Sequence, residues 1–431
     1  MAKQSKLNAY SLYLFISAAS ALGINTVWTV SGVYQVEIVR LNPLQLVLVG
    51  TVLELVTFFL QVPTGALADL YSRRLCITIG YSLVGISYLF QGLVPRFEAI
   101  LLSQVLLAAG FAFVVGAEEA WITSEIGEEQ AGKAFLRSTQ WGLAGALVAV
   151  PLGLTLANRF QFNTPMIVGA GILLLLGTFL LFFMPENNFR PVPKGEQNSW
   201  QMLGQQMTDG GKVVRTSPML LCVLGATLFI ALASEGFDRL DTAHFLQDFT
   251  LPSLWGLKPV TWIGLISFGS TVLGLGATEI VKRFVDTSRP RTVIGSLFVL
   301  QFLAIASVVA FGLVGNFYMA VVAYWCARVI GTLRNPLLGT WITQHTDAKQ
   351  RATIFSFAGT VDPIGQIAGG PLVGAIGVRF SLRAAMIAVS LIMSPTLLFL
   401  GRALGLSKRT PIMAEEEKVE EIRESETRLV P

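Results

Sequence analysis

Charged residues are scarce in this sequence. Asp, Glu, Lys and Arg make up 13% of its 431 residues, whereas an average soluble protein carries about a quarter. Hydrophobic residues make up 53%, so the chain has too little polar surface to cover a soluble globule of its length. The composition excludes an ordinary soluble domain and predicts a protein that lies in a lipid bilayer.

Cysteine and histidine are scarce too, and they form no recognisable motif. Cys76, Cys222 and Cys326 are scattered through apolar runs, and His244 and His345 lie far from them in sequence. No spacing fits a metal centre, a disulfide framework or a redox motif. The sequence also has no recognisable nucleophile or phosphate-binding constellation. We therefore expect no metal, no cofactor and no enzyme activity.

The positive charges do not indicate a nucleic-acid site. The net charge is +4 at pH 7, but the Lys and Arg residues fall in short loops between apolar runs rather than in one patch. We expect anionic lipid headgroups to be their counterpart. Residues 1–6 precede an apolar stretch that is too long for the core of a signal peptide. This stretch is expected to remain as the first helix.

Apolar segments of about 20 residues, the length that crosses a bilayer, recur along the chain. Twelve can be counted, at residues 9–35, 44–68, 75–94, 97–122, 135–158, 164–184, 218–245, 259–283, 292–313, 316–343, 353–378 and 383–404. The sequence therefore predicts an all-α membrane protein with twelve transmembrane helices in two six-helix bundles. The predicted parts are a bundle at 1–184, a cytoplasmic central loop at 185–217, a bundle at 218–404 and an acidic cytoplasmic tail at 405–431.

The distribution of basic residues predicts the orientation. Most of the 31 Lys and Arg residues fall in loops on the side of the two termini. The loops of the other side hold Arg40, Arg96, Arg159, Lys258, Arg379 and Arg383. Because cytoplasmic loops are enriched in Lys and Arg, both termini are predicted to be cytoplasmic in a multi-pass protein of the cell membrane.

The two halves are copies of each other. Short matches recur at one offset of 220 residues: 121–123 with 341–343, 135 with 355, 151–152 with 371–372, 159–160 with 379–380, and 166–167 with 386–387. One shared offset over five pieces is improbable by chance. Parallel repeats of this kind place a binding site near the middle of the membrane, between the halves.

A motif follows the second apolar segment. Residues 62–74 read VPTGALADLYSRR, and the pattern at Gly65, Asp69, Arg73 and Arg74 resembles the loop between the second and third helices of the major facilitator superfamily of secondary transporters. The family usually has a glycine where this chain has Ser72. The resemblance implies that this loop is a cytoplasmic gate, in which Asp69 faces the start of the eleventh helix.

Glycines and prolines in the fifth and eleventh segments resemble a second motif, which drug:proton antiporters of this family carry. The residues are Gly142, Gly145, Pro151, Gly153, Gly369, Gly370, Pro371 and Gly374. Their plain interpretation is close helix packing with a kink. Leu106 stands where antiporters often have an arginine, which counts against a simple transfer of their mechanism.

Two carboxyl groups lie about halfway along apolar segments. Glu54 is in the second and Asp362 in the eleventh. Because desolvation favours the protonated form of a carboxyl group, both are candidate proton carriers. The alternative for each is a structural role, and Asp362 could bond backbone that Pro363 leaves free.

The seventh and tenth segments carry further charges. Glu235, Asp238 and Arg239 share a helical neighbourhood and are candidates for a substrate site or an outer gate. Asp241 and His244 follow them, and we expect these two at the membrane interface. Arg328 and Arg334 stay charged, so each needs a carboxylate or an anionic substrate. Glu54 and Asp362 are the obvious partners.

The resemblance implies alternating-access transport of a small-molecule substrate by a single chain. It is nearest to the drug and siderophore efflux branch, which implies export of a small amphipathic compound in exchange for protons. Two alternatives remain open at this point. One is uptake by proton symport, and the other is a sensor or scaffold that kept the fold without transport.

Overall fold

The computed structural model describes residues 7–407, apart from 190, 192–203, 205–207, 209–210, 213, 216, 254–255, 285, 287 and 347. Most of the central loop, including Lys194, and the acidic tail beyond residue 407 lie outside the described residues. The described chain is all-helical and forms two bundles.

The N-terminal bundle contains α1 (Ala9–Val33), its π-helical extension η1 (Tyr34–Ile38), α2 (Pro43–Leu70), α3 (Arg73–Leu93), α4 (Phe97–Val114), α5 (Ala117–Ile126), α6 (Glu128–Arg159) and α7 (Thr164–Phe183). The C-terminal bundle contains α9 (Pro218–Asp248), α10 (Pro259–Phe284), α11 (Pro290–Leu313), α12 (Phe317–Gln344), α13 (Ala348–Arg379) and α14 (Leu382–Met393). Residues 396–407 continue as helix after a turn.

The twelve predicted segments all fall on helices, so the predicted fold class is confirmed. By length and composition, ten helices of the described chain could cross a membrane. The other two predicted segments fall on α12 and α13, which are more polar and carry Arg328, Arg334 and Asp362. The fourth segment is broken into α4 and α5 at Gly116, whose φ of 80° favours glycine.

Capping side chains mark where several helices begin. The Asn42 side chain accepts a hydrogen bond from the backbone N–H of Gln45 at 2.9 Å, and the Gln45 side chain accepts one from the N–H of Asn42 at 3.0 Å. This pair is a capping box. Ser72 caps α3 by accepting from the N–H of Leu75 at 3.0 Å. Its φ of −171° is ordinary extended backbone, so serine replaces the usual glycine without strain.

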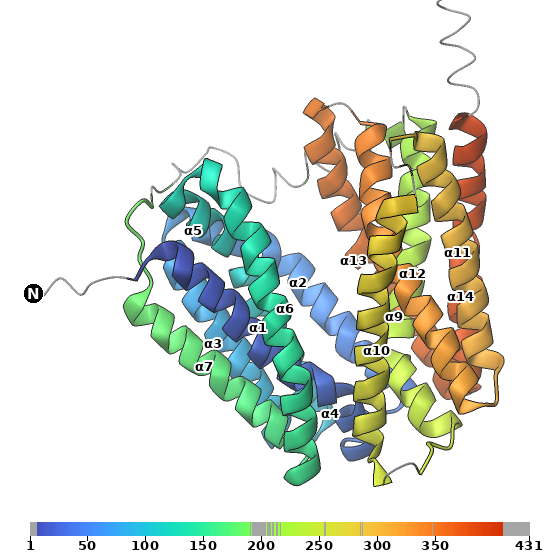
Figure 1. Ribbon diagram of the computed structural model, residues 1–431, viewed down its shortest axis with the longest axis horizontal. Helices are drawn as coiled ribbons and strands as arrows, with labels where there is room; N and C mark the ends of the chain where they lie inside the picture. Colours follow the sequence, from blue (N-terminus) through green and yellow to red (C-terminus); the bar gives the residue numbers. More distant parts are fainter. Residues whose placement is uncertain are drawn as a thin grey trace, which may run out of the picture.

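The two ends of the molecule differ in what they carry. At one end Ser72 donates a hydrogen bond to Glu186 at 2.7 Å, and the Trp121 indole donates to the carbonyl of Pro185 at 2.7 Å. We call this the linker end, because the central connection begins there, and the opposite end the far end. The bundles touch at the far end and diverge toward the linker end (Figure 1).

Glycines allow the closest helix contacts. A Cβ on Gly145 of α6 would lie 2.3 Å from the carbonyl oxygen of Ala18 in α1, and one on Gly369 of α13 would lie 1.9 Å from that of Leu232 in α9. These distances are too short for any side chain. Similar approaches involve Gly153 in α6 and Gly370 and Gly374 in α13, whereas Gly142 has only an ordinary contact and Pro151 and Pro371 lie inside their helices.

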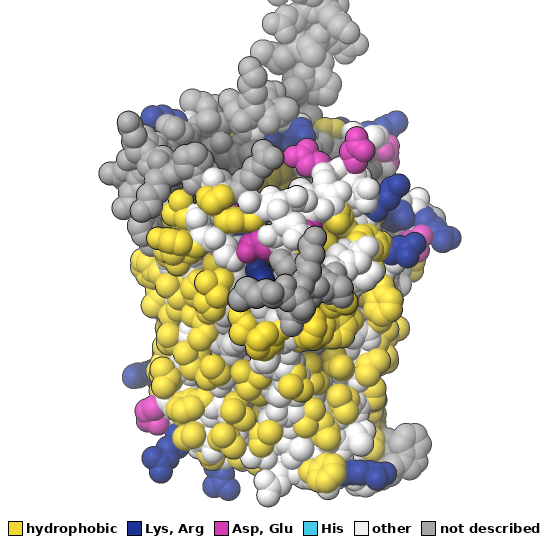
Figure 2. Space-filling model, turned by 90° about the vertical axis from the view of Figure 1, so that its left-hand side faces the viewer, with side chains coloured by type: hydrophobic (Ala, Val, Ile, Leu, Met, Phe, Trp, Pro, Cys, Tyr) yellow, Lys and Arg dark blue, Asp and Glu magenta, His cyan; other side chains and the backbone are white. Residues whose placement is uncertain are grey.

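The surface suits a bilayer. On the side of the N-terminal bundle, a band of hydrophobic side chains lies between charged residues at the two ends (Figure 2). Large apolar side chains such as Leu147, Leu175 and Phe182 are exposed. Water would not stabilise such a surface, but hydrocarbon would.

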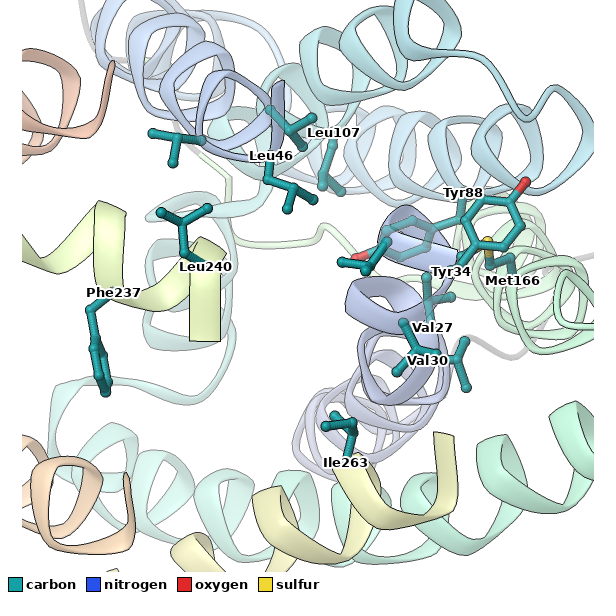
Figure 3. Close-up of a cluster of buried hydrophobic side chains, with 14 of the residues drawn as sticks. Val27, Val30, Tyr34, Leu46, Tyr88, Leu107, Met166, Phe237, Leu240 and Ile263 are labelled. Atoms are coloured by element: carbon teal, nitrogen blue, oxygen red, sulfur yellow. The ribbon is translucent and has the colours of Figure 1, made fainter. Parts of the chain in front are cut away.

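One cluster of buried hydrophobic residues joins the two bundles. It includes Leu46 and Leu107 from the N-terminal bundle and Phe237, Leu240 and Ile263 from the C-terminal bundle (Figure 3). The other buried cluster in the described chain, which contains Leu337 and Trp341, holds residues of the C-terminal bundle and Val214 of the connection before it.

Candidate functional site: a central cavity

A cavity of about 930 Å³ lies between the bundles. Its walls come from α1 to α4 on one side and from α9 to α14 on the other. The sequence-predicted residues that line it are Glu54, Glu235, Asp238, Arg239, Arg328 and Arg334. A volume of this size accommodates a small organic molecule.

The N-terminal wall is mostly neutral. Its polar side chains include Ser31, Gln35, Gln91 and Gln104, and Glu54 supplies its carboxyl group. The Gln91 amide donates a hydrogen bond to Ser31 Oγ at 3.1 Å, and the Gln35 amide donates to the same oxygen at 3.3 Å. Sequence reasoning missed these glutamines, although an amide inside an apolar helix is itself a usable signal.

Glu54 lies one helical turn from Gly50 on α2. Within the described part of the chain, its carboxyl group makes neither a hydrogen bond nor an ion pair. It is therefore the carboxyl group of this cavity that is open to other partners, such as a proton.

The C-terminal wall presents an ion pair to α2. Arg239 Nε donates to Glu235 Oε1 at 2.8 Å, and the Glu235 side chain is 4% exposed. A Cβ on Gly50 would lie 1.5 Å from that oxygen and 2.2 Å from Arg239 Nε. The pair thus lies against the α2 backbone, and sequence reasoning did not single out Gly50.

Arg328 of α12 has two carboxylate partners on α9. Its guanidinium donates to Asp238 and, at 2.5 Å, to Asp241 Oδ2, while its Nε donates to the Tyr324 hydroxyl at 3.0 Å. Its Cζ also lies 5.0 Å from the centre of the Phe237 ring. This arrangement holds the cation through charge, hydrogen bonds and a cation–π contact.

Asp241 and His244 were not among the candidate site residues, because they were expected at the membrane interface. The Asp241 side chain is 8% exposed, pairs with Arg328 and lines the cavity. His244 is fully buried, and its ring contacts Asp248 Oδ2 at 2.6 Å and the carbonyl of Phe311 at 3.0 Å. The reason is that α9 continues to Asp248, so both residues stay inside the bundle.

Glu54 and Asp362 were expected to pair with the two arginines. For Arg328 this prediction is wrong, because it pairs with Asp238 and Asp241 instead. Asp362 instead accepts a hydrogen bond from the Gln366 amide at 2.8 Å, and Gln366 rather than Asp362 lines the cavity. Arg334 lines the cavity, and its Nε is buried without a hydrogen-bond partner among the described residues.

The loop residues predicted to form a gate lie outside the cavity, at the linker end. Arg73 forms an ion pair with Asp69 at 3.2 Å and donates to the Ala120 carbonyl at 2.7 Å. Arg74 donates to the Leu181 carbonyl at 2.5 Å. Among the described residues, no heavy atom lies within 4 Å of a Cβ placed on Gly65. Gly65 therefore makes no close contact with another helix of the described chain in this conformation.

A second cavity, of about 850 Å³, lies at the linker end of the C-terminal bundle. Lys212, Arg215 and Arg402 line it together with apolar residues, and none of the sequence-predicted site residues does. In the described residues, no group of His, Cys, Asp and Glu side chains could hold a metal ion. The central cavity is therefore the candidate functional site.

Comparisons with known proteins agree on the fold. Residues 13–303 match the family model described as Major Facilitator Superfamily. The uncharacterized MFS-type transporter YxaM of Bacillus subtilis (strain 168) is 21% identical over 83% of this chain and 86% of its own length. Multidrug resistance protein MdtG of Proteus mirabilis (strain HI4320) is 23% identical over 74% of this chain and 76% of its own length. A crystal structure of a variant of the nucleoside transporter NupG superposes with a TM-score of 0.73 at 16% identity, over 93% of this chain and 100% of that one.

Proposed function

The chain belongs to the Major Facilitator Superfamily, and from this premise we propose that this membrane transporter exports a small amphipathic compound in exchange for protons. The observation that carries the proposal is Glu54, a cavity carboxyl group without an ion pair in the described structure. It lies one turn from the Glu235–Arg239 pair at Gly50, where the bundles meet. The resemblance to the multidrug resistance protein MdtG supports the direction.

The described conformation is one state of the proposed cycle. The far end is closed and the linker end is open, and the basic loops support a cytoplasmic linker end in the cell membrane. In this state Glu54, which has no ion pair within the described chain, releases its proton through the open linker end. Substrate then enters, and the opposite state loads a proton and releases the substrate. The chain works as a monomer in this proposal.

A second candidate is uptake by proton symport. The hydroxyl and amide groups of the N-terminal wall, at Ser31, Gln35, Gln91 and Gln104, suit hydrogen bonding to a polar substrate. The structural likeness to the nucleoside transporter NupG is compatible with this alternative. Glu54 would carry the proton in both mechanisms.

Proteoliposomes with an imposed pH gradient distinguish the two. The compounds to test are lipophilic cations, macrolides, tetracyclines and siderophores. Antiport accumulates a compound in vesicles that are acidic inside, and symport accumulates it in vesicles that are acidic outside. Accumulation that is the same with and without the pH gradient would refute proton coupling in either direction.

Substitutions at Glu54 test the proton carrier. We expect Glu54→Gln to retain substrate binding and to lose pH-driven accumulation, and Glu54→Asp to keep part of it. Glu37→Gln is the matched control, because Glu37 lies in η1 and does not line the cavity. If Glu54→Gln accumulates substrate like the parent, the carrier is another group, with Asp362 or Glu235 next to be tested.

A further inference from the structure

Of the charged side chains that line the central cavity, Glu54 and Arg334 form no ion pair within the described chain, and Arg334 is the cation of the two. Arg239 is paired with Glu235, and Arg328 is paired with Asp238 and Asp241. Arg334 remains, and it makes neither an ion pair nor a hydrogen bond to the rest of the described chain through its side chain. Because an arginine does not give up its proton in a protein, this site holds a fixed positive charge.

The position of Arg334 exposes it to whatever enters the cavity. Arg328, Gly331, Arg334 and Asn335 all line the cavity from α12. At 1.5 Å per residue, Arg334 lies about 9 Å beyond Arg328 along the helix, toward the open linker end. A substrate that enters from the linker end therefore reaches Arg334 before the paired charges.

Asp238 and Asp362 lie near enough to attract Arg334 by charge, but neither forms an ion pair with it. Asp238 pairs with Arg328, and Asp362 accepts a hydrogen bond from the Gln366 amide at 2.8 Å. A guanidinium that is partly withdrawn from water without an anion is unfavourable. An anion in the cavity would therefore give Arg334 the direct partner that the described chain does not supply.

We propose that Arg334 binds an acidic group of the transported compound, so that the substrate class is an amphipathic organic anion such as an aromatic carboxylate or phosphate. This inference rests on the proposed transport function and names its substrate class. Trp28, Tyr88 and Tyr324 line the same cavity and offer aromatic surface for the apolar part of such a molecule. The guanidinium fork matches carboxylate and phosphate oxygens with two parallel hydrogen bonds.

Matched pairs of probes test the proposal without knowledge of the natural substrate. The pairs are 1-naphthoate with 1-naphthamide, and 1-naphthyl phosphate with 1-naphthol. Binding to the purified full-length protein in detergent is measured by calorimetry, in the absence of any gradient. We expect the anion of at least one pair to bind about tenfold or more tightly than its neutral partner, as a charge-assisted hydrogen bond requires.

Variants assign that preference to Arg334. Arg334→Gln should abolish it and Arg334→Lys should weaken it, because lysine keeps the charge but not the fork. Arg402→Gln, in the second cavity, should keep the full preference. If the glutamine variant does not fold, Arg334→Lys decides, and an unchanged preference in it overturns the proposal.

Two further results would overturn it: no anion preference in the parent, or a preference that survives in folded Arg334→Gln. The proposed proton coupling fails separately, since it is judged by pH-driven accumulation and by Glu54→Gln. Anion preference in detergent without pH-driven transport would leave Arg334 as the anion site and remove the coupling.

Discussion

The far end and the linker end of the interface between the bundles are built differently. At the far end a Cβ on Gly374 of α13 would lie 3.0 Å from Leu44 Cα in α2, and the Asn158 amide donates to Thr261 across the interface at 2.9 Å. At the linker end Gly65 and Gly359 have no described neighbour within 4 Å. The same two helices, α2 and α13, thus pack at one end and separate at the other.

The charges follow the same division. Arg239 and Arg328 have carboxylate partners. Arg334, which lies nearer the open end on α12, and Glu54, one turn from Gly50 on α2, have none among the described residues. A paired charge suits a contact that must hold, and an unpaired charge suits a group that exchanges a proton or a ligand. The comparison therefore separates groups that hold this conformation from groups that are free to react.

A cross-link at the far end should have the largest effect. In a background with Cys76, Cys222 and Cys326 replaced by serine, Leu44→Cys with Gly374→Cys brings two thiols within disulfide reach. Oxidation should lock the far end and abolish transport, and a reductant should restore it. Cross-linking is read from gel mobility of the protein after cleavage between the halves.

The control pair is Gly65→Cys with Gly359→Cys at the linker end, where no described neighbour lies within 4 Å. It should not cross-link in this conformation. Full transport by the oxidised far-end pair would show that closure of this end need not be reversed during the cycle.

The two cavity arginines of α12 should differ in their effect on stability. Arg328→Gln leaves Asp241, whose side chain is 8% exposed, without its partner, and should lower the free energy of unfolding by about 3 kcal/mol. Arg334→Gln removes a charge that has no ion pair here and should change it little. Denaturant unfolding in detergent measures both. Equal losses would contradict the division between paired and unpaired charges.

Much of the fold could be predicted from the sequence, because bilayer thickness fixes helix length. The twelve segments follow from that length, and the helix starts at Asn42 and Ser72 follow from capping chemistry. Six of the charged residues that line the cavity could also be anticipated, since ionisable groups in apolar helices rarely face lipid. Asp362 was expected there and does not line it, and Asp241 lines it without having been expected.

The pairing of those charges could not be predicted from the sequence. Arg328 lies 87 residues from Asp241, and only the packing of α12 against α9 makes them neighbours. Asp241 looked like an interface residue because its apolar segment ends at 245, whereas α9 reaches Asp248. Gly50 belongs to no motif, and its role depends on a side chain from the other bundle. Which end is open depends on the conformation, which one sequence does not specify.

A smaller effect is expected at the open end. Asp69 is half exposed and pairs here with Arg73 of its own loop. In the state with a closed linker end, we predict that it faces the start of α13 and is stabilised by the helix dipole. Asp69→Asn should therefore reduce the transport rate several-fold while expression stays intact. Glu279→Gln on α10, an exposed pair with Arg283, is the control, and a parent-like rate in Asp69→Asn would remove the gating role.

The substitutions that test which end faces the cytoplasm should have the smallest effect on transport. Arg96 and Ser288 are both exposed, Arg96 at the far end and Ser288 between α10 and α11 at the linker end. In the cysteine-free background, an impermeant thiol reagent should label Arg96→Cys on intact cells and Ser288→Cys only after permeabilisation, and neither substitution should change transport. The prediction rests on the enrichment of Lys and Arg in the linker-end loops. Labelling of Ser288→Cys on intact cells would show that the orientation is the reverse, with the open linker end facing outward. The described conformation would then be the one that receives protons from outside.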